Sequence, residues 1–163
     1  MIILGIDPGE TLVGIGIIKK DGSDISIVNY ECIRANSNKK TAEKLFDLSQ
    51  QLSEIIEKYK PDLVSVEELF FFKNKKTIIK VAQARGALLL VCQKHNLKIM
   101  EFTPLQIKQS VACYGRADKK QVQKMVQSIL NLKELPKPDD AADALAAAIC
   151  ASNTNELLMN KNC

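Results

Sequence analysis

Four acidic residues lie where chain elements begin or end among apolar neighbours. Asp7 ends the apolar run IILGI, and Glu67 ends the run LVSV. Asp140 and Asp143 are the only charged residues between positions 140 and 151. An ionised carboxylate in apolar surroundings is strongly disfavoured unless it is paired, and converging carboxylates repel one another. Because a divalent cation removes both costs, these four residues predict a metal-dependent site.

The ligand types narrow the choice of metal. Carboxylate oxygens without a neighbouring Cys or His pattern suit Mg²⁺ or Mn²⁺, whereas zinc prefers nitrogen and sulfur ligands. The chain has one histidine, and its five cysteines show no CxxC spacing. This odd number of cysteines argues against both a zinc site and a disulfide framework.

Each carboxylate also has an interpretation that needs no metal. Asp7 precedes a Pro-Gly pair, and Asp is common in turns. An Asp at a helix start, such as Asp139 or Asp140, caps free N–H groups and complements the helix dipole. Asp143 lies beyond the cap and three residues after Asp140, so these two share a helix face. The four residues together therefore favour a metal site more than any one of them does.

One ambiguity remains at the end of the run LVSV. Glu67 and Glu68 are adjacent, so strand alternation points them to opposite faces and only one of them joins the site. The residues before the strand end do not decide between them.

The elements that must position these carboxylates follow an α/β pattern. Three strands rich in Ile and Val are joined by the turn signals PG and DG, which predicts an antiparallel meander. Helical periods and capping residues then alternate with two short apolar strands. The expected strands cover 2–7, 12–19, 25–34, 62–67 and 97–101, and the expected helices cover 39–59, 75–95, 104–113, 118–130 and the segment from 139 or 140.

This order predicts a mixed sheet covered by helices. The first strand and the strand at 62–67 would be parallel neighbours, joined by a right-handed crossover. Ligands in open α/β sheets bind at the carboxyl ends of strands, at a topological switch point. Asp7 and Glu67 end these two strands, so we expect them at the same edge of the sheet.

The composition bounds the class of protein. The chain of 163 residues, 46% of them hydrophobic, is long enough for one buried core, so we expect a single domain over 1–151 and a polar tail over 152–163. No apolar stretch approaches the length of a membrane span and the start lacks signal-peptide features, which predicts a cytoplasmic protein. A net charge of +4 favours a polyanionic partner, although such a charge is common in soluble proteins.

Several motifs in this order resemble one family. The strings ILGIDPG, VEELF, VAQARGALL, IKQSV, DKKQVQKMV and DDAADALAAAI are similar to the RuvC family of bacterial Holliday-junction resolvases, in the ribonuclease H-like superfamily. Each string is weak alone, but their order and spacing over residues 2–151 are specific. Family sequences often have Gly where Ala82 stands, and some relatives have His in place of Asp140.

The resemblance implies a fold and an activity. It implies a ribonuclease H-like α/β fold, with a mixed five-stranded sheet and helices on both faces. It gives catalytic and metal-binding roles to Asp7, Glu67, Asp140 and Asp143, and it leaves Asp139 outside this set. The implied activity is symmetric nicking of two opposed strands of a four-way DNA junction by a homodimer, with two Mg²⁺ ions in each subunit and Mn²⁺ as a substitute. The implied partners are the branch-migration proteins RuvA and RuvB.

The resemblance also suggests DNA contacts. It singles out Lys108 and Lys119 as contacts to the DNA backbone near the scissile phosphate. Phe70, Phe71 and Phe72 follow the strand that carries Glu67, and an aromatic side chain there can stack on an unpaired base. By resemblance we assign this role to Phe70, and the sequence leaves open which of the three contacts DNA.

Three other functions remain open at this point. A ribonuclease H-like RNA–DNA hybrid hydrolase would use the same metal chemistry. An actin-like ATPase also begins with a strand, an Asp and a Gly-containing turn, but such proteins need two domains of this kind. A non-catalytic junction-binding protein would not need the complete set of carboxylates, and metal-dependent nicking would exclude it.

Overall fold

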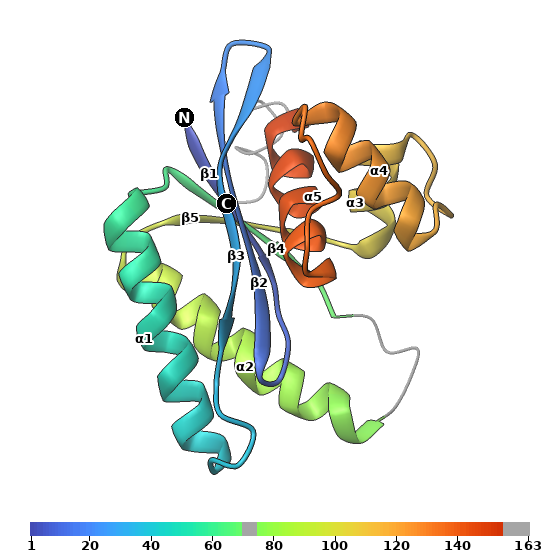
Figure 1. Cartoon of the computed structure of the whole chain (residues 1–163). Helices are drawn as coiled ribbons and strands as arrows, with labels where there is room; N and C mark the ends of the chain where they lie inside the picture. The colour runs from blue at the N-terminus through green and yellow to red at the C-terminus, as the bar shows by residue number, and fades with distance from the viewer. Residues whose placement is uncertain (70–74, 155–163) are drawn as a thin grey trace.

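The strands form one mixed sheet. The computed structural model describes residues 1–69 and 75–154 (Figure 1). The five strands are ordered β3-β2-β1-β4-β5; their bounds are β1 Ile2–Asp7, β2 Leu12–Asp21, β3 Asp24–Arg34, β4 Leu63–Glu67 and β5 Lys98–Phe102. The first three strands form an antiparallel meander, and β4 is parallel to both β1 and β5. The predicted α/β class and the parallel pairing of the first and fourth strands are therefore confirmed.

Helices cover both faces of this sheet. Their bounds are α1 Thr41–Tyr59, α2 Lys75–Lys94, α3 Pro104–Ala112, α4 Lys119–Ile129 and α5 Asp139–Asn153. Figure 1 shows α1 and α2 on one face and α3, α4 and α5 on the other. Each layer has its own apolar cluster against the sheet. None of the helices in these described segments is long and apolar enough to cross a membrane.

Glycines allow α5 to lie directly on the strands. A Cβ atom placed on Gly14 would lie 1.9 Å from the backbone oxygen of Asp140, and one on Gly5 would lie 1.9 Å from that of Ala144. No side chain fits at either position, so the helix backbone contacts the strand backbone. The Ala-rich sequence of α5 supports the same close approach from the helix side.

The helix ends differ slightly from the expected ones. The starts of α3 and α4 lie where they were expected, and Thr103 and Asp118 cap them by accepting hydrogen bonds from the backbone N–H groups of residues 106 and 121. However, α3 ends at Ala112, one residue before the expected position 113, and Cys113 caps it with a left-handed φ of 54°. The cap of α5 is Pro138, so neither Asp139 nor Asp140 caps the helix.

The C-terminal end of α5 also lies beyond the expected boundary. The helix continues to Asn153, two residues past position 151, at which we expected the domain to end. The Lys20 ammonium donates a hydrogen bond to the carbonyl oxygen of Ser152, and the Ser152 hydroxyl donates to that of Ile149. A cation at a helix C-terminus stabilises the free carbonyl groups there, which explains why the helix persists.

Candidate active site

The sheet brings two of the predicted carboxylates to one edge. Asp7 is the last residue of β1, and Glu67 is the last residue of β4. These strands are parallel, and Ile6 pairs with Val66 directly before the two acids. Asp7 and Glu67 are therefore neighbours at the carboxyl ends of adjacent strands, as the sequence predicted.

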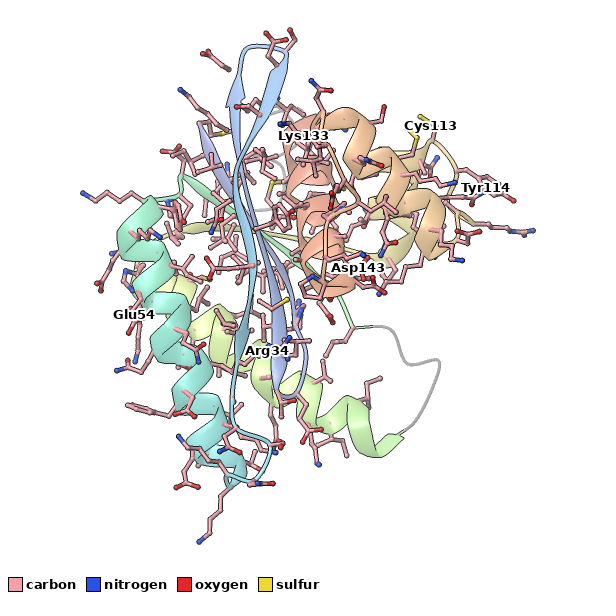
Figure 2. All side chains as sticks on the ribbon, in the orientation of Figure 1. Arg34, Glu54, Cys113, Tyr114, Lys133 and Asp143 are labelled. Atoms are coloured by element: carbon pink, nitrogen blue, oxygen red, sulfur yellow. The ribbon has the colours of Figure 1, made fainter. Side chains whose placement is uncertain are left out.

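The first turns of α5 bring the other two carboxylates to this edge. Asp7 pairs with Gly14 across the β1–β2 ladder, and the backbone of Asp140 lies against Gly14. Asp143 lines a cleft together with Glu67. Figure 2 shows Asp143 on the lower turns of α5, close to where β4 ends, whereas Tyr114 lies on the outer side of the α3–α4 layer.

The ionisation of Asp7 reflects this crowding. Burial, together with the charges of Glu67, Asp143 and Asp140, raises the pKa of Asp7 from an ordinary value of 3.8 to about 8, while Lys119 opposes the shift. Burial also raises the pKa of Asp143, and Lys119 lowers it. A cluster of this kind binds a cation readily, because the cation relieves both desolvation and repulsion.

The structure resolves the choice between the two adjacent glutamates. Glu67 lines a cleft of about 180 Å³, together with Lys108, Lys119 and Asp143. Burial and the charge of Asp143 raise the pKa of Glu67 to about 7, although Lys108 and Lys119 oppose the shift. The charge of Glu68 acts instead on Arg85 of α2, on the other face of the sheet. Glu67 is therefore the member of the pair that faces the cleft.

Lys119 supplies positive charge to the carboxylates of α5. Its Nζ atom lies 3.0 Å from Oδ2 of Asp143 and 3.6 Å from Oδ2 of Asp139. The side-chain amide of Gln123, which is only 8% exposed, donates a hydrogen bond of 2.9 Å to the other oxygen of Asp139. Asp139 is thus turned toward α4 by two partners.

The donor set fits a hard divalent cation. All four carboxylates offer oxygen, the preferred ligand of Mg²⁺ and Mn²⁺. Among the described residues, no group of three or more His, Cys, Asp or Glu side chains has an arrangement ready to hold a metal ion. Mutual repulsion and the ion pair of Lys119 with Asp143 account for this arrangement.

Two residues near the site had no assigned role in the sequence analysis. Cys32 pairs with Gly14 in the β2–β3 ladder, and burial and the charge of Asp140 raise the pKa of its thiol. Arg85 donates a hydrogen bond to the backbone carbonyl of Glu67. Cys32 and Arg85 lie near the site because of strand register and helix packing, and neither can be recognised from a linear sequence motif. Phe70, by contrast, lies outside the described residues.

The fold and the acidic strand ends define the class of protein. The described structure matches that of Thermus thermophilus RuvC in complex with a Holliday junction substrate, with a TM-score of 0.88, 33% identity and 93% of each chain covered. It also matches Thermus thermophilus RuvC, with a TM-score of 0.85, 32% identity and the same coverage. The chain therefore has the ribonuclease H-like fold.

Sequence comparison identifies the family. The family model described as crossover junction endodeoxyribonuclease RuvC matches residues 3–151. The protein of this description from Caldicellulosiruptor saccharolyticus is 54% identical over 151 residues, which cover 92% of this chain and 91% of the relative. That from Ruminiclostridium cellulolyticum is 48% identical over 157 residues, with 96% and 95% covered. The chain belongs to the RuvC family.

Proposed function

We propose that this protein is a crossover junction endodeoxyribonuclease that resolves four-way Holliday junctions during DNA recombination and repair. The observation that carries the proposal is the cleft at the carboxyl ends of β1 and β4, where acidic side chains meet two lysines. Carboxylates suit the metal, and lysines suit the phosphate of the DNA backbone. The related structure with a Holliday junction substrate supports the choice of DNA substrate.

The four carboxylates are proposed as the catalytic metal ligands. Asp7 and Glu67 would act from the strand ends, and Asp140 and Asp143 from α5. Two Mg²⁺ ions, or Mn²⁺ in their place, would supply an activated water and stabilise the leaving 3′-oxygen, so that the products carry 5′-phosphate and 3′-hydroxyl ends. The protein's own part is to hold the ligands on a rigid backbone frame and to remain folded despite their repulsion.

The cations of the cleft are proposed to place the scissile phosphate. Lys108 on α3 and Lys119 on α4 line the cleft from the side opposite the sheet. In the metal-free arrangement Lys119 pairs with Asp143. A metal ion that took over Asp143 would leave the Lys119 ammonium available for a phosphate oxygen. Phe70 remains a proposed stacking contact for a base near the crossover.

Paired cuts need two sites, and α2 has a surface suited to a second copy. Its residues Ile79 and Leu90 are 61% and 56% exposed, and an apolar cavity of about 420 Å³ lies beside Ile79 and Ala82. A Cβ atom on Gly86 would meet no atom of the described residues within 4 Å, which leaves room for a partner at this part of the helix. We propose that two copies pack through this face as a homodimer with two-fold symmetry.

The cellular setting completes the proposal. An enzyme that cuts recombination intermediates acts in the cytoplasm of a bacterial cell, where it meets the branch-migration proteins RuvA and RuvB. These partners are proposed from family resemblance alone.

One cleavage assay tests the function. The purified protein is incubated with a labelled four-way junction and with an RNA–DNA hybrid duplex of equal length, with and without Mg²⁺, and products are resolved to the nucleotide. We expect symmetric nicks in the junction only, ligatable ends, and no cutting by Asp7→Asn. Preferred cutting of the hybrid would instead assign a hybrid hydrolase. Junction binding without metal-dependent nicking would assign a non-catalytic binding protein.

A further inference from the structure

Arg85 of α2 is a half-buried cation at the edge of the sheet that carries Glu67. Its side chain is 18% exposed. Its Nε atom donates a hydrogen bond of 3.2 Å to the backbone carbonyl of Glu67, and its guanidinium forms an ion pair with Glu101 of β5. One side chain therefore connects α2 with the last residues of β4 and with β5.

This contact lies where the ladder gives least support to β4. The pairing of β1 with β4 ends at Ile6 and Val66, so Glu67 has no partner in β1. On its other side Glu67 pairs with Phe102, and the N–H group of Glu68 donates to the carbonyl of Phe102. The direction of the Glu67 side chain thus depends on β5 and on the bond from Arg85.

The environment of Arg85 favours this role. Burial lowers the pKa of its guanidinium, and the charge of Glu68 opposes the shift. A half-buried guanidinium is costly unless its donors find acceptors, and here they find a carbonyl and a carboxylate. The bond is made to the backbone of Glu67, so both oxygens of the Glu67 carboxylate remain available to the cleft.

We propose that Arg85 is a positioning residue that holds Glu67 in the orientation required for metal binding. The proposal rests on the metal site inferred above and adds a residue on the opposite face of the sheet. Residues that orient metal ligands commonly affect metal affinity by about 10-fold to 100-fold when they are replaced. Loss of the Arg85 contact should therefore weaken the metal site even though Arg85 touches no metal.

The test measures metal binding by the full chain without DNA. Mn²⁺ affinity is determined by electron paramagnetic resonance titration, and the melting temperature is measured without metal. We expect Arg85→Met to weaken Mn²⁺ binding about tenfold. Arg85→Lys should give a smaller loss, since an ammonium retains a donor but lacks the planar fork. The matched control, Glu101→Gln, keeps the bond from Arg85 to Glu67 and should bind Mn²⁺ like the wild type.

The outcomes separate a positioning role from a structural one. A lower melting temperature for Arg85→Met, with unchanged Mn²⁺ affinity of the folded protein, would overturn the proposal. If Arg85→Met does not fold, Arg85→Lys decides: weaker Mn²⁺ binding at an unchanged melting temperature supports the role, and equal binding overturns it. Glu67→Gln is titrated alongside. Equal binding by Glu67→Gln and the wild type would overturn the metal site itself, and the role of Arg85 with it.

Discussion

At the scale of single residues, the carboxylates are arranged for function at the expense of the metal-free fold. The pKa values of Asp7 and Glu67 are raised to about 8 and about 7, chiefly by burial. An ordinary structural Asp or Glu gains partners and has a lowered pKa. This opposite shift in two neighbouring strand ends is typical of a cation site.

The first prediction concerns the ligand set. Replacing Asp7, Glu67, Asp140 or Asp143 singly with its amide should leave the protein folded and lower cleavage by about 100-fold or more, because a charged metal ligand is lost. Asp139→Asn is the matched control and should be far milder. Circular dichroism and single-turnover cleavage check both points. An inactive Asp139→Asn beside an active Asp140→Asn would show that the wrong member of this pair was assigned.

The second prediction concerns the stability of the metal-free protein. The folded-state pKa of Asp7, about 8, lies above its ordinary value of 3.8. The contribution of protonated Asp7 to the free energy of unfolding is therefore fully present below about pH 4. It is lost as the pH rises through about 8, by up to ~1.4 kcal/mol per pH unit. Asn at this position does not titrate. The stability of Asp7→Asn relative to the wild type should thus increase with pH.

Urea unfolding in a chelating buffer at pH 5 and at pH 8 measures this difference. We expect Asp7→Asn to be the more stable protein at pH 8, with a smaller advantage at pH 5. A constant difference between the two proteins would show that Asp7 is not buried among like charges. Addition of Mg²⁺ at pH 8 should stabilise the wild type more than the variant, because only the wild type retains the full ligand set.

At the scale of elements, the contact of α5 with β1 and β2 positions the site. We predict that Gly14→Ala lowers both stability and cleavage, since the added Cβ would lie 1.9 Å from the backbone oxygen of Asp140. Overpacking of this kind commonly costs about 1 to 3 kcal/mol and here displaces the helix start. Thermal unfolding and cleavage rates measure the two effects.

The control for this prediction is Gly22→Asn. Gly22 has a φ of 58°, and within the described part of the chain no atom lies within 4 Å of an added Cβ. Because Asn tolerates left-handed backbone, this variant should behave like the wild type. If Gly14→Ala has wild-type stability and activity, the close contact between α5 and the sheet does not set the geometry of the site.

The sequence predicted the elements well because their signals are local. Capping chemistry predicted helix starts at about residues 104 and 118, and the observed caps Thr103 and Asp118 confirm both. The close approach of α5 to the sheet depends on Gly5 and Gly14, which lie on two different strands and meet the helix only in the folded protein. The choice between Glu67 and Glu68 depended on which face of the sheet the α3–α4 layer covers, a tertiary property that the run LVSV does not contain. The pairing of Lys119 with Asp143 likewise depends on how α4 lies against α5.

At the scale of the whole molecule, the proposed dimer brings one active site to each of two opposed DNA strands of the junction. We predict that Leu90→Glu gives a monomer, because the dimer would have to bury the new carboxylate in its interface. Burial of a charge costs at least about 3 kcal/mol, and this cost weakens dimer association by more than about 100-fold. Sedimentation velocity measures the mass. The variant should still bind metal but should fail to make paired cuts in one binding event.

Val28→Glu is the matched control, because Val28 is a similarly exposed apolar residue on the edge strand β3. It should remain dimeric and active. A dimeric Leu90→Glu protein would exclude the α2 face as the interface and would leave the proposed cleavage chemistry intact.

The backbone contact between α5 and the glycines of the sheet has a further consequence for how the sequence can drift. Elsewhere in the two apolar layers, the distance between a helix and the sheet depends on the sizes of the side chains packed between them. Between α5 and Gly5 or Gly14 there is no such side chain, so backbone atoms alone set the separation. Exchanges among Leu, Ile and Val in either layer can therefore accumulate over generations, while Asp140 and Asp143 keep their distance from Asp7.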